Sequence, residues 1–173
     1  MITKKITEHN YHEFFMLEAL KMAHKASDCN EVPVGAIIVK DGKIIGSGFN
    51  EVINKNSVLF HAEMIAIYHA SQTLNNYRLT GAQIYCSLEP CHMCAKAILD
   101  ARIDHLFFGA LEPKTGAITS IDKFFDREDL NHQVHYSGGH LAERSSLLLR
   151  NFFQSKRAKK IQKNYFNSSH TGQ

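Results

Sequence analysis

Residues 82–103, AQIYCSLEPCHMCAKAILDARI, contain the pattern that decides the fold of this chain. The first seven of them, 82–88, are mostly apolar and predict a buried strand. Pro90 follows, a residue suited to the first turn of a helix, and residues 90–101 predict that helix. A strand that leads directly into a helix, with two cysteines at the junction, is typical of an α/β domain.

The alternation of strand and helix extends in both directions from this stretch. Before it, the predicted elements are a helix, two strands and a second helix, at residues 11–27, 32–39, 43–49 and 61–74. Asp41-Gly42 between the two strands is a typical tight-turn pair, so these strands are expected to form a hairpin.

Beyond the opening stretch the signal continues with a strand at 103–108 and weakens after Gly116. A short helix near 119–126, a strand near 132–136 and a helix at 140–153 are expected there. We therefore predict an α/β fold with helices on the faces of a sheet. One domain should span residues 1–155, and the basic end, 156–173, should either continue the last helix or be disordered.

The composition is that of a globular protein, with 173 residues, 44% hydrophobic and 21% charged. The first ten residues, MITKKITEHN, have no apolar stretch behind their lysines, which argues against a secretory signal. No segment approaches the roughly 20 apolar residues of a membrane helix. We expect a cytoplasmic protein without a membrane partner, in which cysteines are metal ligands or buried thiols rather than disulfides.

The net charge of +3 is unevenly distributed. Residues 156–173 contain five basic and no acidic side chains, whereas acidic residues outnumber basic ones in the rest of the chain. Such an end could contact phosphates, or it could be a solvated tail that only aids solubility. Charge alone leaves both possibilities open.

Two short motifs at predicted helix starts contain metal-binding residues. Cys91 and Cys94 are three apart, so they project from one face of a helix, and a helix N-terminus favours the thiolates that bind metal. A catalytic zinc adds a histidine and keeps one position open for water, and His61 can supply that ligand. Glu63 is placed to act as general base and then general acid, because zinc makes its bound water acidic.

Each motif alone has a simpler explanation. A Cys-x-x-Cys pair can be redox-active or half of a zinc knuckle, but no thioredoxin-like context surrounds it, and Cys29 and Cys86 are not spaced as a second pair. An isolated His-x-Glu is common by chance. Because both motifs begin predicted helices, together they predict a catalytic zinc held by His61, Cys91 and Cys94.

His61-Ala62-Glu63 followed by Pro90-Cys91 and Cys94 resembles the signature of zinc-dependent nucleobase deaminases. Within that class the chain is similar to bacterial tRNA-specific adenosine deaminases over about residues 11–157. The segments that carry this similarity are EVPVGAIIV (31–39), GFN (48–50), NYRL (76–79), LEPCHMC (88–94), FGA (108–110), PKTGA (113–117) and Phe152-Phe153.

The resemblance implies hydrolysis of adenosine to inosine at the wobble position of a tRNA anticodon loop. It further implies one Zn²⁺ per subunit, a homodimer, and a three-layer α/β/α cytidine-deaminase-like fold with a mixed five-stranded sheet. Asn50 should hydrogen-bond the base, and Ala62 should contact it through its backbone. The remaining substrate contacts that the resemblance implies are the pocket wall of Leu88, Glu89 and Pro90, together with Glu112, Lys114, Phe152, Lys156 and Arg157.

Relatives often have Asp where Glu112 stands, and the longer side chain shifts the reach of the carboxylate toward the ribose. Two other functions stay open. One is deamination of a free base or nucleoside such as guanine or cytosine, which needs no basic end. The other is a zinc-stabilised binding module without activity. Free-base and RNA substrates distinguish the first, and replacement of Glu63 by Ala tests the second.

Overall fold

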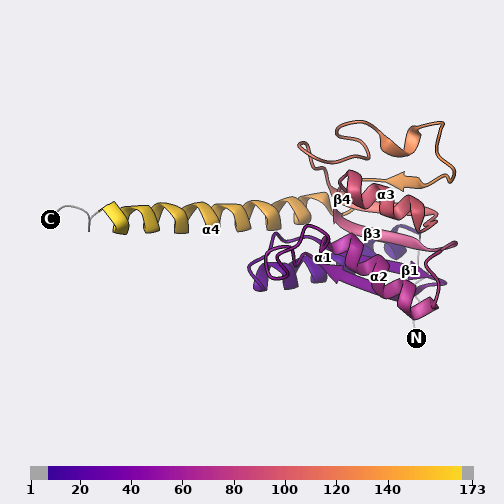
Figure 1. Ribbon diagram of the computed structural model, residues 1–173, viewed down its shortest axis with the longest axis horizontal. Helices are drawn as coiled ribbons and strands as arrows, with labels where there is room; N and C mark the ends of the chain where they lie inside the picture. The colour runs from indigo at the N-terminus through magenta and orange to yellow at the C-terminus, as the bar shows by residue number, and fades with distance from the viewer. Residues whose placement is uncertain (1–7, 169–173) are drawn as a thin grey trace.

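The computed structural model describes the backbone of residues 8–168 (Figure 1). Five strands, four α-helices and one short 3₁₀-helix alternate along this part of the chain. Their order is α1 (Glu8–Asp28), β1 (Gly35–Lys40), β2 (Lys43–Phe49), α2 (Ala62–Leu74), β3 (Gln83–Leu88), α3 (His92–Asp100), β4 (His105–Ala110), η1 (Phe124–Asp126), β5 (His135–Ser137) and α4 (Ala142–Ser168).

The strands form one mixed sheet in the order β2-β1-β3-β4-β5. β1 pairs antiparallel with both β2 and β3, whereas β3, β4 and β5 are parallel to one another. The carboxyl ends of the parallel strands therefore meet at one edge, where ligand sites of α/β proteins gather. The predicted mixed five-stranded sheet is confirmed.

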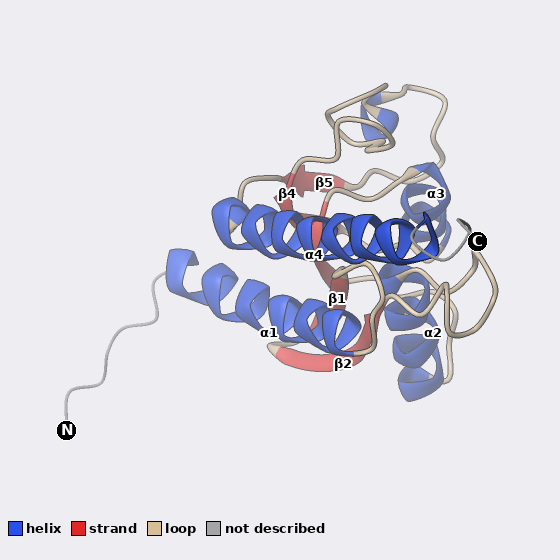
Figure 2. Ribbon diagram, turned by 90° about the vertical axis from the view of Figure 1, so that its left-hand side faces the viewer, coloured by secondary structure: helices blue, strands red, loops and turns tan. Residues whose placement is uncertain are grey.

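The two faces of the sheet pack against different helices, which gives three layers (Figure 2). Alternate side chains point to opposite faces. Ile37, Tyr85 and Phe107 pack with α1, while Ile38 and Ile84 belong to the larger core shared with α2 and α3. The predicted α/β/α architecture is confirmed, and both motif-bearing helices lie on the same face.

The β1–β2 hairpin turns at the residues that the sequence indicated. Asp41 and Gly42 have φ angles of 50° and 71°, so both adopt the left-handed conformation that a type I′ turn requires. The pairing of Lys40 with Lys43 closes the hairpin. The pairing shifts by one residue between Ile38 and Val39, and with this shift the end of β2 lies beside the start of α2.

Close packing of α2 on β2 depends on two glycines. A Cβ at Gly48 would collide with the backbone oxygen of Ala62 and lie 2.7 Å from the Ala66 nitrogen, and Gly46 is similarly close to Ala66 and Ala70. Only glycine lets the helix backbone approach the strand this closely. The start of α2, which includes the His-x-Glu motif, is thereby held against the sheet.

The last helix is longer than the range 140–153 that its apolar pattern predicted. It begins at Ala142 and runs to Ser168, so it crosses residue 155 and includes most of the basic end, for which a continued helix and disorder were both expected. Its second half extends away from the sheet and its covering helices (Figure 1). Residues 169–173 lie outside the described part. The domain boundary at residue 155, which stays a prediction, therefore falls inside a helix.

The segment between β4 and α4 is less regular than expected. The helix predicted near 119–126 is only the 3₁₀ turn Phe124–Asp126, and the strand predicted near 132–136 is His135–Ser137. Within residues 8–168, no helix combines the length and apolarity needed to cross a membrane.

Candidate active site

Three metal-binding side chains meet where α2 and α3 begin. His61 is the N-cap of α2 and Cys91 is the N-cap of α3, with Cys94 in the first turn. The prediction placed Pro90 and Cys91 inside the helix, but both precede it. Neither cap side chain bonds its own helix, so both are directed toward the shared site.

The donor atoms are spaced as a tetrahedral zinc site requires. The Nδ1 atom of His61 lies 3.7 Å from Sγ of Cys91 and 3.5 Å from Sγ of Cys94. Zn–S and Zn–N bonds of normal length at a tetrahedral angle give an S–N separation of about 3.6 Å. All three ligand atoms lie within 4.8 Å of one another, and the described residues contain no other such group. The donors therefore fit zinc.

Hydrogen bonding prepares one of the two cysteines for metal. The Cys94 thiol donates to the Cys91 sulfur, and with His61 this outweighs burial and lowers the pKa of Cys91 to about 3. The same hydrogen bond, together with burial, raises the pKa of Cys94. Binding of a metal ion has to displace the proton that remains on the two sulfurs.

Glu63 is the buried carboxyl group of the site. Its side chain is only 4% exposed, and burial raises its pKa because a charge is poorly solvated there, although the backbone and His61 oppose the shift. A carboxyl group with a raised pKa can hold and release a proton near neutral pH. Its position in the first turn of α2 places it beside the metal ligands.

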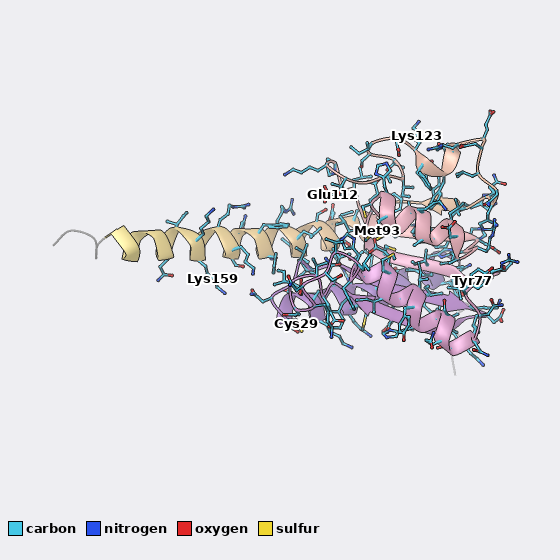
Figure 3. All side chains as sticks on the ribbon, viewed as in Figure 1. Cys29, Tyr77, Met93, Glu112, Lys123 and Lys159 are labelled. Atoms are coloured by element: carbon cyan, nitrogen blue, oxygen red, sulfur yellow. The ribbon has the colours of Figure 1, made fainter. Side chains whose placement is uncertain are left out.

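A cavity of about 160 Å³ opens onto the ligands and Glu63. It lies at the carboxyl edge of the parallel strands, and Met93 and Glu112 lie at this end of the sheet while Tyr77 is at the opposite end (Figure 3). The residues lining it are Val32, Val34, Asn50, His61, Glu63, Leu88, Glu89, Cys91, Glu112 and Thr115. A larger hollow of about 820 Å³ beside residues 125–136 contains none of these groups.

Asn50 connects the end of β2 to the start of α2. Its side-chain oxygen accepts the backbone N–H of Ala62 at 3.1 Å, which fixes the orientation of the amide within the cavity wall. The predicted backbone contact of Ala62 with a base stays a prediction, and that N–H already has a partner. Asn50 thus forms part of the cavity wall with its oxygen engaged.

Glu89 organises the loop that closes one side of the cavity. Although it is only 2% exposed, its carboxylate accepts backbone N–H groups of Glu112, Ile118, Thr119 and Ser120 and both hydroxyls of Thr119 and Ser120. Burial alone would raise its pKa, but these hydrogen bonds prevail and lower it. Glu89 therefore positions the loop, with both oxygens engaged.

Glu31 is a structural residue of the site that the sequence analysis missed. It is 1% exposed, and its carboxylate accepts the backbone N–H groups of Ile53 and Asn54 at 3.1 and 2.7 Å. These bonds anchor the loop that runs from β2 to His61. The only signal in the sequence was an acidic residue in an otherwise apolar segment, which does not reveal its partner.

The residues predicted at the outer rim are dispersed. Glu112 lines the cavity and accepts the N–H of Lys114, whose own side chain is exposed. On α4, the ring of Phe152 is 8% exposed and that of Phe153 is 44% exposed, so Phe153 is the ring available to a partner. Pro90 is buried behind the cavity wall, and Arg157 is exposed on α4.

The mixed sheet, the zinc-type donor set and the buried Glu63 together define a zinc-dependent deaminase. In agreement, residues 9–110 match the profile of the cytidine and deoxycytidylate deaminase zinc-binding region. The chain is 46% identical over 155 residues to a tRNA-specific adenosine deaminase of Haemophilus influenzae, covering 88% of this chain and 90% of the relative. Thus the chain belongs to the tRNA-specific adenosine deaminase family.

Other comparisons support the family at higher sequence identity and the fold alone at lower identity. A tRNA-specific adenosine deaminase of Bacillus subtilis is 39% identical over 148 residues, covering 86% of this chain and 92% of the relative. A structure from work on tRNA:A34 deaminases is 40% identical with a TM-score of 0.76, covering 79% and 99% of the two chains. A guanine deaminase from Nitrosomonas europaea, at 22% identity, TM-score 0.69 and coverages of 81% and 83%, shares the fold.

Proposed function

We propose that this deaminase converts the wobble adenosine of a tRNA anticodon loop to inosine and releases ammonia. The observation that carries the proposal is the small cavity in which Glu63 and Asn50 lie beside the His61 and Cys91 donors. Its volume of about 160 Å³ is below the range of about 300–1,000 Å³ typical of larger ligands. It suits a single nucleobase, and the similarity of the chain to tRNA-specific adenosine deaminases favours a base extruded from an RNA, with its ribose and phosphates outside.

His61, Cys91 and Cys94 would hold the zinc, which when bound supplies the Lewis acidity that makes water nucleophilic at neutral pH. Glu63 takes a proton from that nucleophile and delivers a proton to the departing amine, so its carboxyl group ends each cycle unchanged. Asn50 orients the base, because its oxygen is already tied to α2 and only its amide nitrogen is left to donate. Glu89 holds the loop that keeps the base in place.

The rim beside the cavity supports an RNA substrate. Glu112 and Thr115 line the cavity, and Lys156 lies on α4 next to Asn30, with its ammonium group 3.3 Å from the Asn30 carbonyl oxygen. Recognition of RNA loops commonly combines splayed bases with aromatic and basic groups. We propose that Glu112, Lys114, Lys156 and Arg157 meet the loop, and that the exposed ring of Phe153 takes the contact predicted for Phe152, which is buried.

The test compares inosine formation in an anticodon stem-loop with ammonia release from free adenosine, guanine and cytosine. We expect turnover only of the RNA that has adenosine at the wobble position, and none when the adenosine is moved by one nucleotide. The matched variant is Glu63→Gln, which keeps the shape of the side chain. Efficient turnover of a free base with inert RNA would overturn the proposal.

We also propose a homodimer that forms through the outer face of α2. A groove of about 560 Å³ runs along this face and is lined by Leu59, Phe60, Met64, Ile65 and Tyr68, among others. Val58, Leu59 and Tyr68 are 59–69% exposed, an unusual concentration of apolar side chains on a surface. Sedimentation analysis of the parent and of Tyr68→Lys should show a dimer and a monomer, respectively, and two monomers would refute this assignment.

A tRNA substrate also points to the cytoplasm as the location of the protein. Cell fractionation with an antibody against the chain tests this, and recovery from the membrane or secreted fraction would contradict it.

A further inference from the structure

The projecting half of α4 has a stripe of lysines. Lys156 and Lys159 follow the buried Phe152 at spacings of four and seven residues, so they continue the helix face that packs on the body. Lys160 lies four residues after Lys156 on the same side. Both Lys159 and Lys160 are exposed, and Lys159 lies well away from the sheet (Figure 3). We call Lys156, Lys159 and Lys160 the lysine stripe.

The charge of this segment has no internal compensation. The sequence contains no Asp or Glu after Glu143, although seven Lys and Arg residues follow it. Among the side chains that the structure describes, neither Lys159 nor Lys160 has an ion-pair partner. A cationic helix face without acidic neighbours attracts a polyanion.

The lysine stripe begins at a segment that leads into the wall of the catalytic cavity. Lys156 contacts the carbonyl of Asn30, which ends the turn after α1, and Val32, two residues further, lines the cavity. From there, Lys160 lies about 6 Å further along the helix axis than Lys156, and the end of α4 lies about 18 Å away. The phosphate backbone of an RNA that leaves the cavity can therefore follow a row of basic side chains along α4.

We propose that Lys159 and Lys160 bind the phosphate backbone of the base-paired stem that adjoins the substrate loop. This rests on the proposed function, because it takes the target nucleotide to be in the cavity. Lys156 at the rim meets the nucleotides next to the target, so groups further along α4 are reached only by nucleotides more distant in the RNA. Lysines bind such phosphates as point charges and do not read sequence.

The experiment uses two RNAs of the same sequence. One is an anticodon stem-loop, and in the other the stem phosphates alone are replaced by uncharged methylphosphonates. Binding is measured over a range of salt concentrations with Glu63→Gln, which leaves the RNA intact, and with the same protein containing Lys159→Gln and Lys160→Gln. Lys43→Gln with Arg78→Gln, which removes two exposed charges outside α4, is the matched control.

On the natural RNA, loss of both lysines should flatten the slope of log affinity against log salt by about two. On the neutral-stem RNA the same substitutions should change nothing, and the control pair should match the parent on both. Equal losses on both RNAs, no loss on either, or a changed oligomeric state that implicates a second copy would each overturn the proposal. Inosine formation by the parent is scored separately, so failure of the proposed function is recognised independently.

Discussion

Replacing Glu89 by Gln should destabilise the protein, because the NH₂ group of Gln is a hydrogen-bond donor and the groups that bond to the Glu89 carboxylate are all donors too. The two Glu89 oxygens accept four backbone N–H groups and two hydroxyls. The amide of Gln can adopt two orientations, and the less costly one places its NH₂ group where Oε2 was, because Oε2 accepts fewer hydrogen bonds than Oε1. The NH₂ group then faces the N–H of Glu112 and the Ser120 hydroxyl. The three backbone N–H groups that bond to Oε1 keep an oxygen acceptor, but that acceptor is now a neutral amide oxygen and no longer a carboxylate oxygen.

The expected loss follows from these contacts. An unsatisfied buried donor costs about 1–3 kcal/mol, and a hydrogen bond to a charged group contributes roughly 1 kcal/mol more than a neutral one. Since the Ser120 hydroxyl can rotate and the loop can relax, we expect a total of about 2–5 kcal/mol. For a chain of this size that lowers Tm by about 5–15 °C.

The assay is urea and thermal unfolding of the zinc-loaded protein, with Glu128→Gln as control because Glu128 is exposed in the same segment. The pKa of folded Glu89 is lowered, so its stabilising contribution is present above the ordinary glutamate pKa of about 4.3 and is lost as the pH falls through the folded value. The difference between parent and variant should therefore shrink below about pH 4. A variant as stable as the parent at pH 7, or a difference independent of pH, would refute the reasoning.

Three further substitutions test other parts of the structure. Glu63→Gln should retain zinc by metal analysis yet lower inosine formation by about 10²-fold or more, and loss of zinc would contradict a purely proton-transferring role. Cys91→Ser should lower both zinc content and Tm, and full occupancy would remove Cys91 from the ligand set. Gly48→Ala should cost about 1–3 kcal/mol or more in urea unfolding, because its Cβ meets the backbone of Ala62 and Ala66. Unchanged unfolding would show that α2 can shift.

The sequence predicted the sheet and the metal donors well, because both depend on local patterns. Apolar runs marked β1 and β3, Asp41-Gly42 marked the hairpin, and the two motifs marked helix starts. That the two motifs lie close together could be expected only because helices that directly follow strands of one sheet can begin at the same edge of that sheet. The element order alone could not place β1 between β2 and β3, because that depends on pairing between distant segments.

The predictions failed where structure depends on tertiary contacts or on their absence. The sequence left open whether the basic end continues the last helix, because residues beyond 153 have no apolar face to mark one, although Lys, Arg, Ala and Gln favour helix without it. The roles of Glu31 and Glu89 were not predictable either. Each accepts hydrogen bonds from a loop some 20–30 residues away, and nothing in the local sequence marks such a pairing.

The metal donors lie at the starts of two separate helices, so a bound ion holds these two helix starts together. One imidazole comes from the segment that follows β2, and both sulfurs come from the segment that follows β3, so a bound ion ties together parts of the chain separated by about 30 residues. Because the unfolded chain has no preformed site, the binding free energy of the ion adds to the stability of the folded state. A chelator would then act on this protein as a denaturant as well as an inhibitor, and amides in the first turns of α2 and α3 would lose their protection from solvent exchange together.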